Sequence, residues 1–234
     1  MIARLAVIGC VASVVIAMAN ATRAVRAAEA RDASAALPFY RSPTMTPEWL
    51  GDREASAPSM HRVADFAALD QRSLNVTQRD LDGRITIVQF FFTKCGDLCP
   101  TTTRNLAAVA RDRHGQRELQ LLSFSVAPDG DVVPTLAAYA AEHHITDPRW
   151  RLLTGSRSSI ETLARSSFFV RLGDGSTYDV ATIAHTESVL LVDGCRRLRG
   201  VYAGTLRLEM DRLREDVVTL ARDPCTRPSL TLPP

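Results

Sequence analysis

The sequence has little lysine, few aromatic residues and almost no net charge. Lys94 is the single lysine among 28 basic residues, aromatic residues make up 6%, and the formal net charge of the 234-residue chain is +2. Because the charge is small and the arginines are scattered, a strongly basic surface is excluded and no nucleic acid is expected as a partner. Hydrophobic residues still make up 46% of the chain, which is enough to bury a core and excludes disorder over its whole length.

Long hydrophobic runs are also scarce, and the single candidate lies at the N-terminus. Residues 5–19 are apolar, follow a short positive segment and precede Ala19-Asn20-Ala21, which has the form of a signal-peptide cleavage site. The run is about 15 residues long, whereas a membrane-spanning helix needs roughly 20. We therefore predict a signal peptide over residues 1–21 and an exported, periplasmic protein. An uncleaved anchor attached to the inner membrane and facing the periplasm is the second reading, and lipidation at Cys10 is the third.

Composition divides the exported chain into an arm, a domain and a tail. Residues 22–60 are rich in alanine, proline, serine and arginine, which predicts an extended arm or linker. Some docking of this arm on the domain is predicted by four apolar residues: Phe39, Tyr40, Trp49 and Leu50. We predict the folded domain over residues 61–225 and a C-terminal tail over residues 226–234.

The apolar pattern of the domain alternates between strands and helices. Residues 85–92 are almost all apolar and β-favouring, which predicts a central strand buried on both faces. The remaining predicted elements are strands at 119–126 and 150–153, helices at 101–113 and 133–143, a short helix capped by Ser158 and Glu161, and a hairpin at 188–192 and 198–202. This order predicts an α/β protein with a thioredoxin-like fold, in which helices flank a mixed central sheet and a terminal β-hairpin precedes a C-terminal helix.

The last predicted helix has the clearest periodicity. Its apolar residues recur at spacings of three and four and form one stripe: Leu206, Met210, Leu213, Val217 and Leu220. Thr205 is expected to cap its start, and Pro224 to end it. Because the helix runs back toward the hairpin, Cys225 after the helix should return to Cys195 at the hairpin turn. We predict a structural disulfide between Cys195 and Cys225, with a second metal site as the alternative.

Cys95 and Cys99 lie between the predicted central strand and the helix that follows it. The N-terminus of a helix carries unpaired N–H groups and a positive dipole, so we expect lowered pKa values for these cysteines. Thiolates at this position could serve thiol–disulfide exchange, in which Cys95 and Cys99 form a redox-active disulfide. They could equally serve as ligands of a metal ion. The three intervening residues, one more than in the usual redox motif, allow the loop to fold around an ion. A plain disulfide brace is the third reading.

Two sulfurs do not specify a metal site, and histidine is the usual source of a third ligand. His185 lies just before the predicted hairpin, in a loop that faces the cysteine-bearing turn in a thioredoxin-like fold, so it is the candidate ligand. His143 and His144 at a helix end, and His114 in a polar segment, are expected to be solvated. His61 lies where the arm joins the domain.

At this point the sequence resembles the Sco/SenC family of copper-binding, thioredoxin-like proteins. The matching segments are residues 90–100 around the cysteine pair, 125–131, 149–155 and 185–194. The resemblance implies that Cys95, Cys99 and His185 bind one copper per chain, as Cu(I) or Cu(II). It also implies the family's role, which is to deliver copper to the dinuclear copper centre of cytochrome c oxidase subunit II or to reduce that subunit's cysteines.

The resemblance makes a metallochaperone the first hypothesis, ahead of an enzyme. Its implied partners are subunit II or another copper acceptor, together with a periplasmic copper donor or thiol reductant. A thiol–disulfide oxidoreductase is the alternative, although Ala184-His185-Thr186 lacks the proline that many such enzymes place opposite the cysteines. A peroxidase ranks third, because it needs one activated cysteine and no histidine. Ala127 and Ala184 stand where the family commonly has aspartate, whereas Asp131 is retained.

Overall fold

The computed structural model describes residues 36–96, 98–113, 116–172 and 187–226. The predicted signal peptide over residues 1–21 therefore lies outside the described residues, as does His185. Among the helices of the described ranges, none has the length and apolar character needed to cross a membrane.

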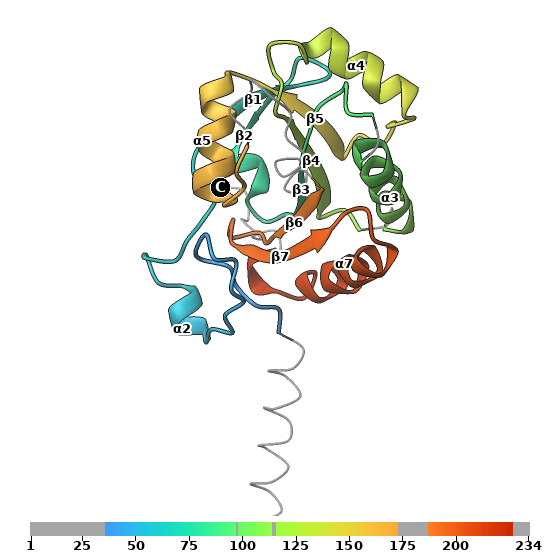
Figure 1. The fold of residues 1–234 in the computed structure, drawn as a ribbon. Coiled ribbons are helices and arrows are strands. Elements are labelled where there is room, and N and C mark those ends of the chain that lie inside the picture. The colour runs from blue at the N-terminus through green and yellow to red at the C-terminus, as the bar shows by residue number, and fades with distance from the viewer. Residues whose placement is uncertain (1–35, 97, 114–115, 173–186, 227–234) are drawn as a thin grey trace, which may run out of the picture. The chain divides into compact units, whose positions relative to one another are not determined.

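One seven-stranded sheet organises the domain in the order β2-β1-β5-β4-β3-β6-β7 (Figure 1). Its strands are β1 (Ala67–Asp70), β2 (Asn75–Thr77), β3 (Ile85–Phe91), β4 (Leu119–Ser125), β5 (Trp150–Thr154), β6 (Ser188–Val192) and β7 (Leu198–Ala203). The three central strands β3, β4 and β5 are parallel, and the other pairs are antiparallel. The predicted mixed sheet and terminal hairpin are thus confirmed. Strands β1 and β2 were not predicted, because both are short and expose part of their residues.

Helices cover both faces of this sheet (Figure 1). They are α3 (Leu98–Asp112), α4 (Val133–Glu142), α5 (Arg157–Ser167) and α7 (Arg207–Leu220). Helix α2 (Asp52–Ala55) lies apart from the sheet, and η1 (Gln78–Leu81) and η2 (Pro224–Thr226) are short 3-10 helices (Figure 1). Apolar residues of α3, α4 and α7 pack in one core cluster, and those of α5 pack in a second cluster with the opposite residues of the strands. Every residue of β3 and β4 is consequently buried, which explains why most of their residues are apolar.

Three helix starts differ from their predictions: α3 begins at Leu98 instead of residue 101, and the caps of α5 and α7 differ from the predicted residues. Leu206, rather than Thr205, is the N-cap of α7, and its side chain is 56% exposed instead of belonging to the buried stripe. The Thr205 hydroxyl donates to the Glu187 carboxylate at 2.9 Å, and Thr205 lies one residue before the N-cap position because α7 begins at Arg207. Helix α5 is capped by Ser156, whose hydroxyl accepts from the Ser159 amide at 3.2 Å; Ser158 lies inside the helix.

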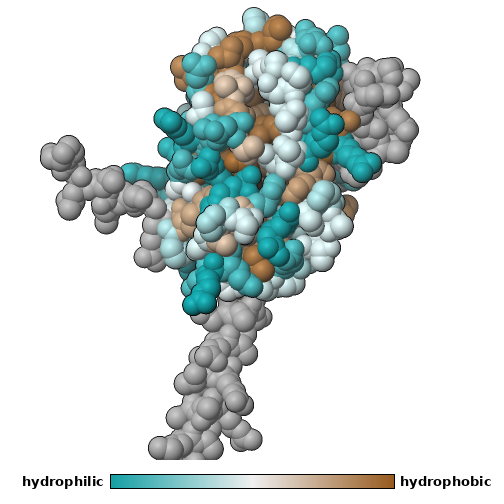
Figure 2. Space-filling model, turned by 90° about the vertical axis from the view of Figure 1, so that its left-hand side faces the viewer, coloured by the Kyte–Doolittle hydropathy of each residue, from teal (hydrophilic) through white to brown (hydrophobic). Residues whose placement is uncertain are grey.

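Part of the predicted arm packs on the domain. The Tyr40 amide donates to the Leu198 carbonyl of β7 at 3.0 Å, and Phe39 pairs with Glu48 in an isolated β-bridge. Phe39 also forms a small apolar cluster with Ala55 and Met60. Trp49, by contrast, is 63% exposed. On the face of the molecule in Figure 2, hydrophilic side chains interrupt the apolar ones.

Candidate metal centre

The cysteine pair occupies the junction between β3 and α3. Strand β3 ends at Phe91, and α3 begins at Leu98 with Cys99 and Pro100 in its first turn. Cys95 is half-buried, Cys99 is 2% exposed, and both are free thiols. The Cys99 amide donates to the Cys95 sulfur at 3.3 Å, so an N–H group of the first helical turn points at that sulfur. This hydrogen bond and the helix dipole both favour a negative charge on Cys95.

The electrostatics differ between the two cysteines. The expectation of a lowered pKa is wrong for Cys99, because its hydrogen bond with the Cys95 side chain, its burial and the nearby Cys95 charge all raise its pKa. Two adjacent sulfurs cannot both carry a negative charge in a buried site without a compensating cation. The pair therefore holds at least one proton that a metal ion would have to displace.

A buried carboxylate fixes the strand end that leads to the cysteines. Asp131, 3% exposed, accepts from the Thr93 amide at 3.0 Å, from the Thr93 hydroxyl at 2.5 Å and from the Ser125 hydroxyl at 2.6 Å. These bonds tie the segment after β3 to the end of β4. Asp131 was noted from the sequence, but no role was assigned to Thr93 or Ser125. The position of Thr93 beside the cysteine loop, and of Ser125 in the matched segment 125–131, could have indicated their importance.

Tyr139 of α4 packs against the end of β3 and the first turns of α3, next to the cysteine pair. Its ring packs on Phe91 with centroids 5.3 Å apart, and its hydroxyl lies 3.2 Å from the Thr103 hydroxyl. Burial, with smaller contributions from Cys99 and Cys95, raises the pKa of Tyr139 to about 12. The sequence placed Tyr139 on the apolar face of its helix but gave no sign of this proximity to the thiols.

The histidines have different surroundings. His185, the predicted third ligand, and His114 lie outside the described residues. His143, expected to be solvated, is partly buried, because its ring packs on Tyr139 with centroids 4.1 Å apart. His144 is exposed, as expected. In His61, the Nε2 atom lies 2.9 Å from the Ser167 carbonyl oxygen.

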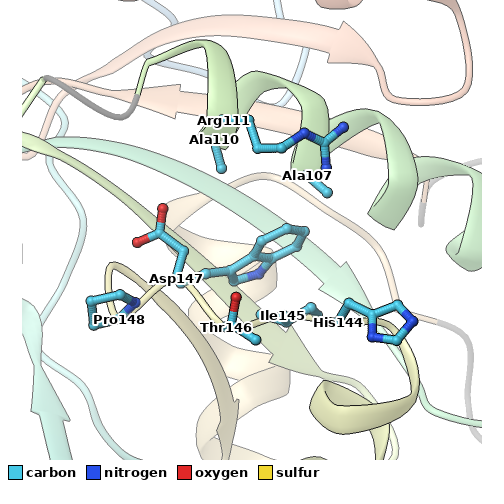
Figure 3. Close-up of a pocket in the computed structure, with 9 residues that line it drawn as sticks. Ala107, Ala110, Arg111, His144, Ile145, Thr146, Asp147 and Pro148 are labelled. Carbon is cyan, nitrogen blue, oxygen red and sulfur yellow. The ribbon is translucent and has the colours of Figure 1, made fainter.

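No described group of three or more His, Cys, Asp or Glu side chains is arranged to hold a metal ion. The described part of the chain contributes the two sulfurs of Cys95 and Cys99. A separate pocket of about 490 Å³ lies between α3 and the segment entering β5 and contains neither cysteine (Figure 3). In Figure 3 the small side chains of Ala107 and Ala110 point toward the loop from Ile145 to Pro148. We assign no role to this pocket.

A mixed sheet whose central strand leads through two free thiols into a helix defines a thioredoxin-like dithiol protein. Within that class, the chain belongs to the SCO1/SenC family, whose sequence model matches residues 54–222. Among curated proteins, the SCO1 protein homolog of Bacillus subtilis is 28% identical over 171 residues, which are 71% of this chain and 86% of that protein.

Solved structures have the same fold. BsSco, a member of the Sco family of cytochrome c oxidase assembly proteins, superposes with a TM-score of 0.61 at 27% identity, covering 70% of this chain and 95% of that one. The copper-bound ScoI of Arabidopsis thaliana superposes with a TM-score of 0.53 at 25% identity, covering 68% and 97%.

Proposed function

We propose that this protein is a copper metallochaperone that holds one copper ion through Cys95, Cys99 and His185. The observation that carries the proposal is the pair of free thiols at the β3–α3 junction, with the Cys99 amide directed at the Cys95 sulfur. The copper bound to the related Arabidopsis protein supports it. Delivery to the dinuclear copper centre of cytochrome c oxidase subunit II is the proposed end of the transfer.

The chemistry of the donors fits this cargo. Thiolates are soft ligands that prefer Cu(I), and imidazole binds either oxidation state. A bound Cu(I) ion would replace protons on the thiols and would compensate negative charge on Cys99, whose pKa is raised by its hydrogen bond with the Cys95 side chain and by burial. Two sulfurs and one nitrogen leave copper open to an incoming ligand, so the ion can pass to a partner by ligand exchange.

The sheet register supports His185 as the third donor. Strand β6 runs antiparallel to β3, with Val189 opposite Gln89, so the beginning of β6 lies beside the end of β3. The Gly204 amide donates to the Glu187 carbonyl at 2.8 Å and anchors the residue that precedes β6. His185 is three residues before Ser188, a length of chain that reaches about 10 Å when extended.

Thiol–disulfide exchange is the second candidate function, favoured by the asymmetry of the two thiols. Cys95 is the more exposed, and the raised pKa of Cys99 keeps that thiol protonated. Cys95 would attack a partner's disulfide, and Cys99 would then resolve the mixed disulfide. This activity would keep the acceptor's cysteines reduced for metallation. In either function the protein would act in the periplasm, after removal or membrane retention of residues 1–21.

Anaerobic competition against a chromophoric Cu(I) chelator tests the proposal. The wild type should bind one equivalent, and both His185→Ala and Cys95→Ser/Cys99→Ser should weaken binding. His144→Ala is the matched control, because His144 is exposed at the end of α4 and should leave binding unchanged. Binding that is insensitive to His185→Ala would remove that ligand. Absence of binding by the wild type would leave thiol–disulfide exchange as the function.

A further inference from the structure

Two arginines of the terminal hairpin are almost completely buried. Arg197 and Arg199 are each 5% exposed, and Asp193, in the turn before them, is fully buried. Asp193 Oδ2 accepts from Arg197 at 2.7 Å and from Arg199 at 3.0 Å. A second carboxylate, Asp223 after α7, accepts from Arg199 at 2.8 Å. Two buried cations are thus balanced by two carboxylates, and removing either carboxylate leaves a positive charge uncompensated.

The arm docks on these same arginines. The Phe39 ring lies 4.0 Å from the Arg199 guanidinium and 5.0 Å from that of Arg197. Arg199 donates to the carbonyls of Leu37 at 2.8 Å and Pro38 at 3.1 Å, and Arg197 donates to the Ala55 carbonyl at 3.3 Å. The guanidiniums must therefore be held in place by Asp193 and Asp223 for the arm to bind them.

A disulfide joins the two carboxylate-bearing segments. Cys195 is bonded to Cys225, and both residues are partly exposed. The Cys195 amide donates to Asp193 Oδ1 at 3.0 Å, and the Cys225 amide donates to Asp223 Oδ1 at 2.9 Å. The bond thus fixes Asp223 relative to Asp193. A Cβ atom at Gly194 would lie 1.9 Å from the Cys225 carbonyl oxygen, so glycine is required for this close approach.

We propose that the Cys195–Cys225 disulfide is a redox-controlled clamp that governs docking of arm residues 37–60. One thiolate of an external dithiol attacks a sulfur of the disulfide, forms a mixed disulfide with it and releases the other protein sulfur as a thiolate. The second thiolate of the dithiol then attacks the reductant's own sulfur in the mixed disulfide and releases the remaining protein sulfur. Two electrons pass to the protein, which gains two thiols, while the reductant becomes a disulfide. Asp223 is then no longer fixed beside Asp193, the two arginines lose their common orientation, and the arm detaches.

The clamp is separate from the Cys95–Cys99 site. Strand β6 pairs Val192 with Thr86 near the start of β3, and the Gly83 amide donates to the Gly194 carbonyl at 2.9 Å. The hairpin turn therefore lies at the end of β3 opposite to Cys95. Coupling between disulfide and arm is reciprocal, so a docked arm must also protect the disulfide against reduction.

Limited trypsin digestion of the whole protein tests the clamp. The protein carries Cys95→Ser/Cys99→Ser, so that Cys195 and Cys225 are the remaining cysteines of the described residues. On reduction with dithiothreitol, cleavage after Arg41 and Arg53 in the arm should accelerate about tenfold or more. Cleavage after Arg165, which lies inside α5 and needs that helix to open, should accelerate less than cleavage in the arm. Unchanged arm cleavage would overturn the proposal, and so would equal acceleration at Arg165, which would show general unfolding.

A second variant tests reciprocity without removing the disulfide. Phe39→Ala in the oxidised protein should accelerate cleavage of the arm. It should also accelerate reduction of the Cys195–Cys225 disulfide, which is measured by alkylating the released thiols. Leu208→Ala is the control, because that apolar side chain is 72% exposed and lies outside the arm, so both rates should stay unchanged. A Phe39→Ala protein whose disulfide is reduced at the wild-type rate would overturn the proposed coupling.

Discussion

Asp131 binds Thr93 through both atoms that Thr93 can donate from, although the two residues are 38 positions apart. The carboxylate also accepts from Ser125, so it joins the end of β4 to the segment that leads from β3 to the cysteines. The geometry of Cys95 and Cys99 therefore depends on a residue that need not touch either sulfur.

Replacement of this carboxylate should affect both stability and metal binding. Asp131→Asn retains the size but puts a donor where an acceptor is needed, so we expect a loss of about 1–3 kcal/mol in the free energy of unfolding. Cu(I) affinity should fall about 10–100-fold. Urea denaturation and chelator competition measure the two effects. Asp129→Asn, at a side chain 75% exposed, should change stability by less than about 0.5 kcal/mol.

Stability should fall at alkaline pH because of Cys99. Its pKa is raised in the folded protein above the value of about 8.5 expected for an unfolded chain. Above pH 8.5 the unfolded state therefore loses a proton that the folded state keeps, and stability decreases as pH rises. Urea unfolding of the metal-free, reduced protein between pH 7 and 10 measures the slope. Cys99→Ser should flatten it; an equal slope in both proteins would contradict this assignment.

Gly204 should not tolerate a side chain. A Cβ atom there would lie 2.5 Å from the Thr102 side chain and 2.8 Å from the Glu187 carbonyl oxygen. Gly204→Ala should cost about 1–3 kcal/mol and displace the segment that enters β6. Thermal denaturation measures the cost, and reduced Cu(I) affinity would reveal the displacement. At Gly51 a Cβ atom meets nothing within 4 Å, so Gly51→Ala should have little effect on either measurement.

The disulfide should also contribute to overall stability. Cys195 and Cys225 are separated by 30 residues, and the loss of a cross-link across such a loop costs about 3.6 kcal/mol in the chain-entropy model. Cys195→Ser/Cys225→Ser should therefore unfold at a lower urea concentration than the wild type. Mass spectrometry of non-reduced peptides should find the two cysteines linked. Separate, unlinked peptides would contradict this prediction.

The sequence anticipated the elements whose environment is uniform along their length. Strand β3 has helices on both sides, so each of its residues is buried and almost all of them are apolar or β-favouring. Strands β1 and β2 alternate between buried and exposed residues over only four and three positions, which is too short for a clear period. Thr205 is a residue type that often caps helices, but α7 begins one residue later than its pattern predicts, so Leu206 occupies the cap position.

By itself, the sequence determined the α/β order, the terminal hairpin and the position of two cysteines between a strand and a helix, because these follow from neighbouring residues. Only the tertiary structure decided the raised pKa of Cys99, the anchoring of Thr93 by Asp131 and the burial of Arg199 against the arm. From sequence alone, an arginine is expected to be exposed to solvent. Arg199 is buried because its partners include Leu37, 162 residues away, and only folding brings such charges and acceptors together.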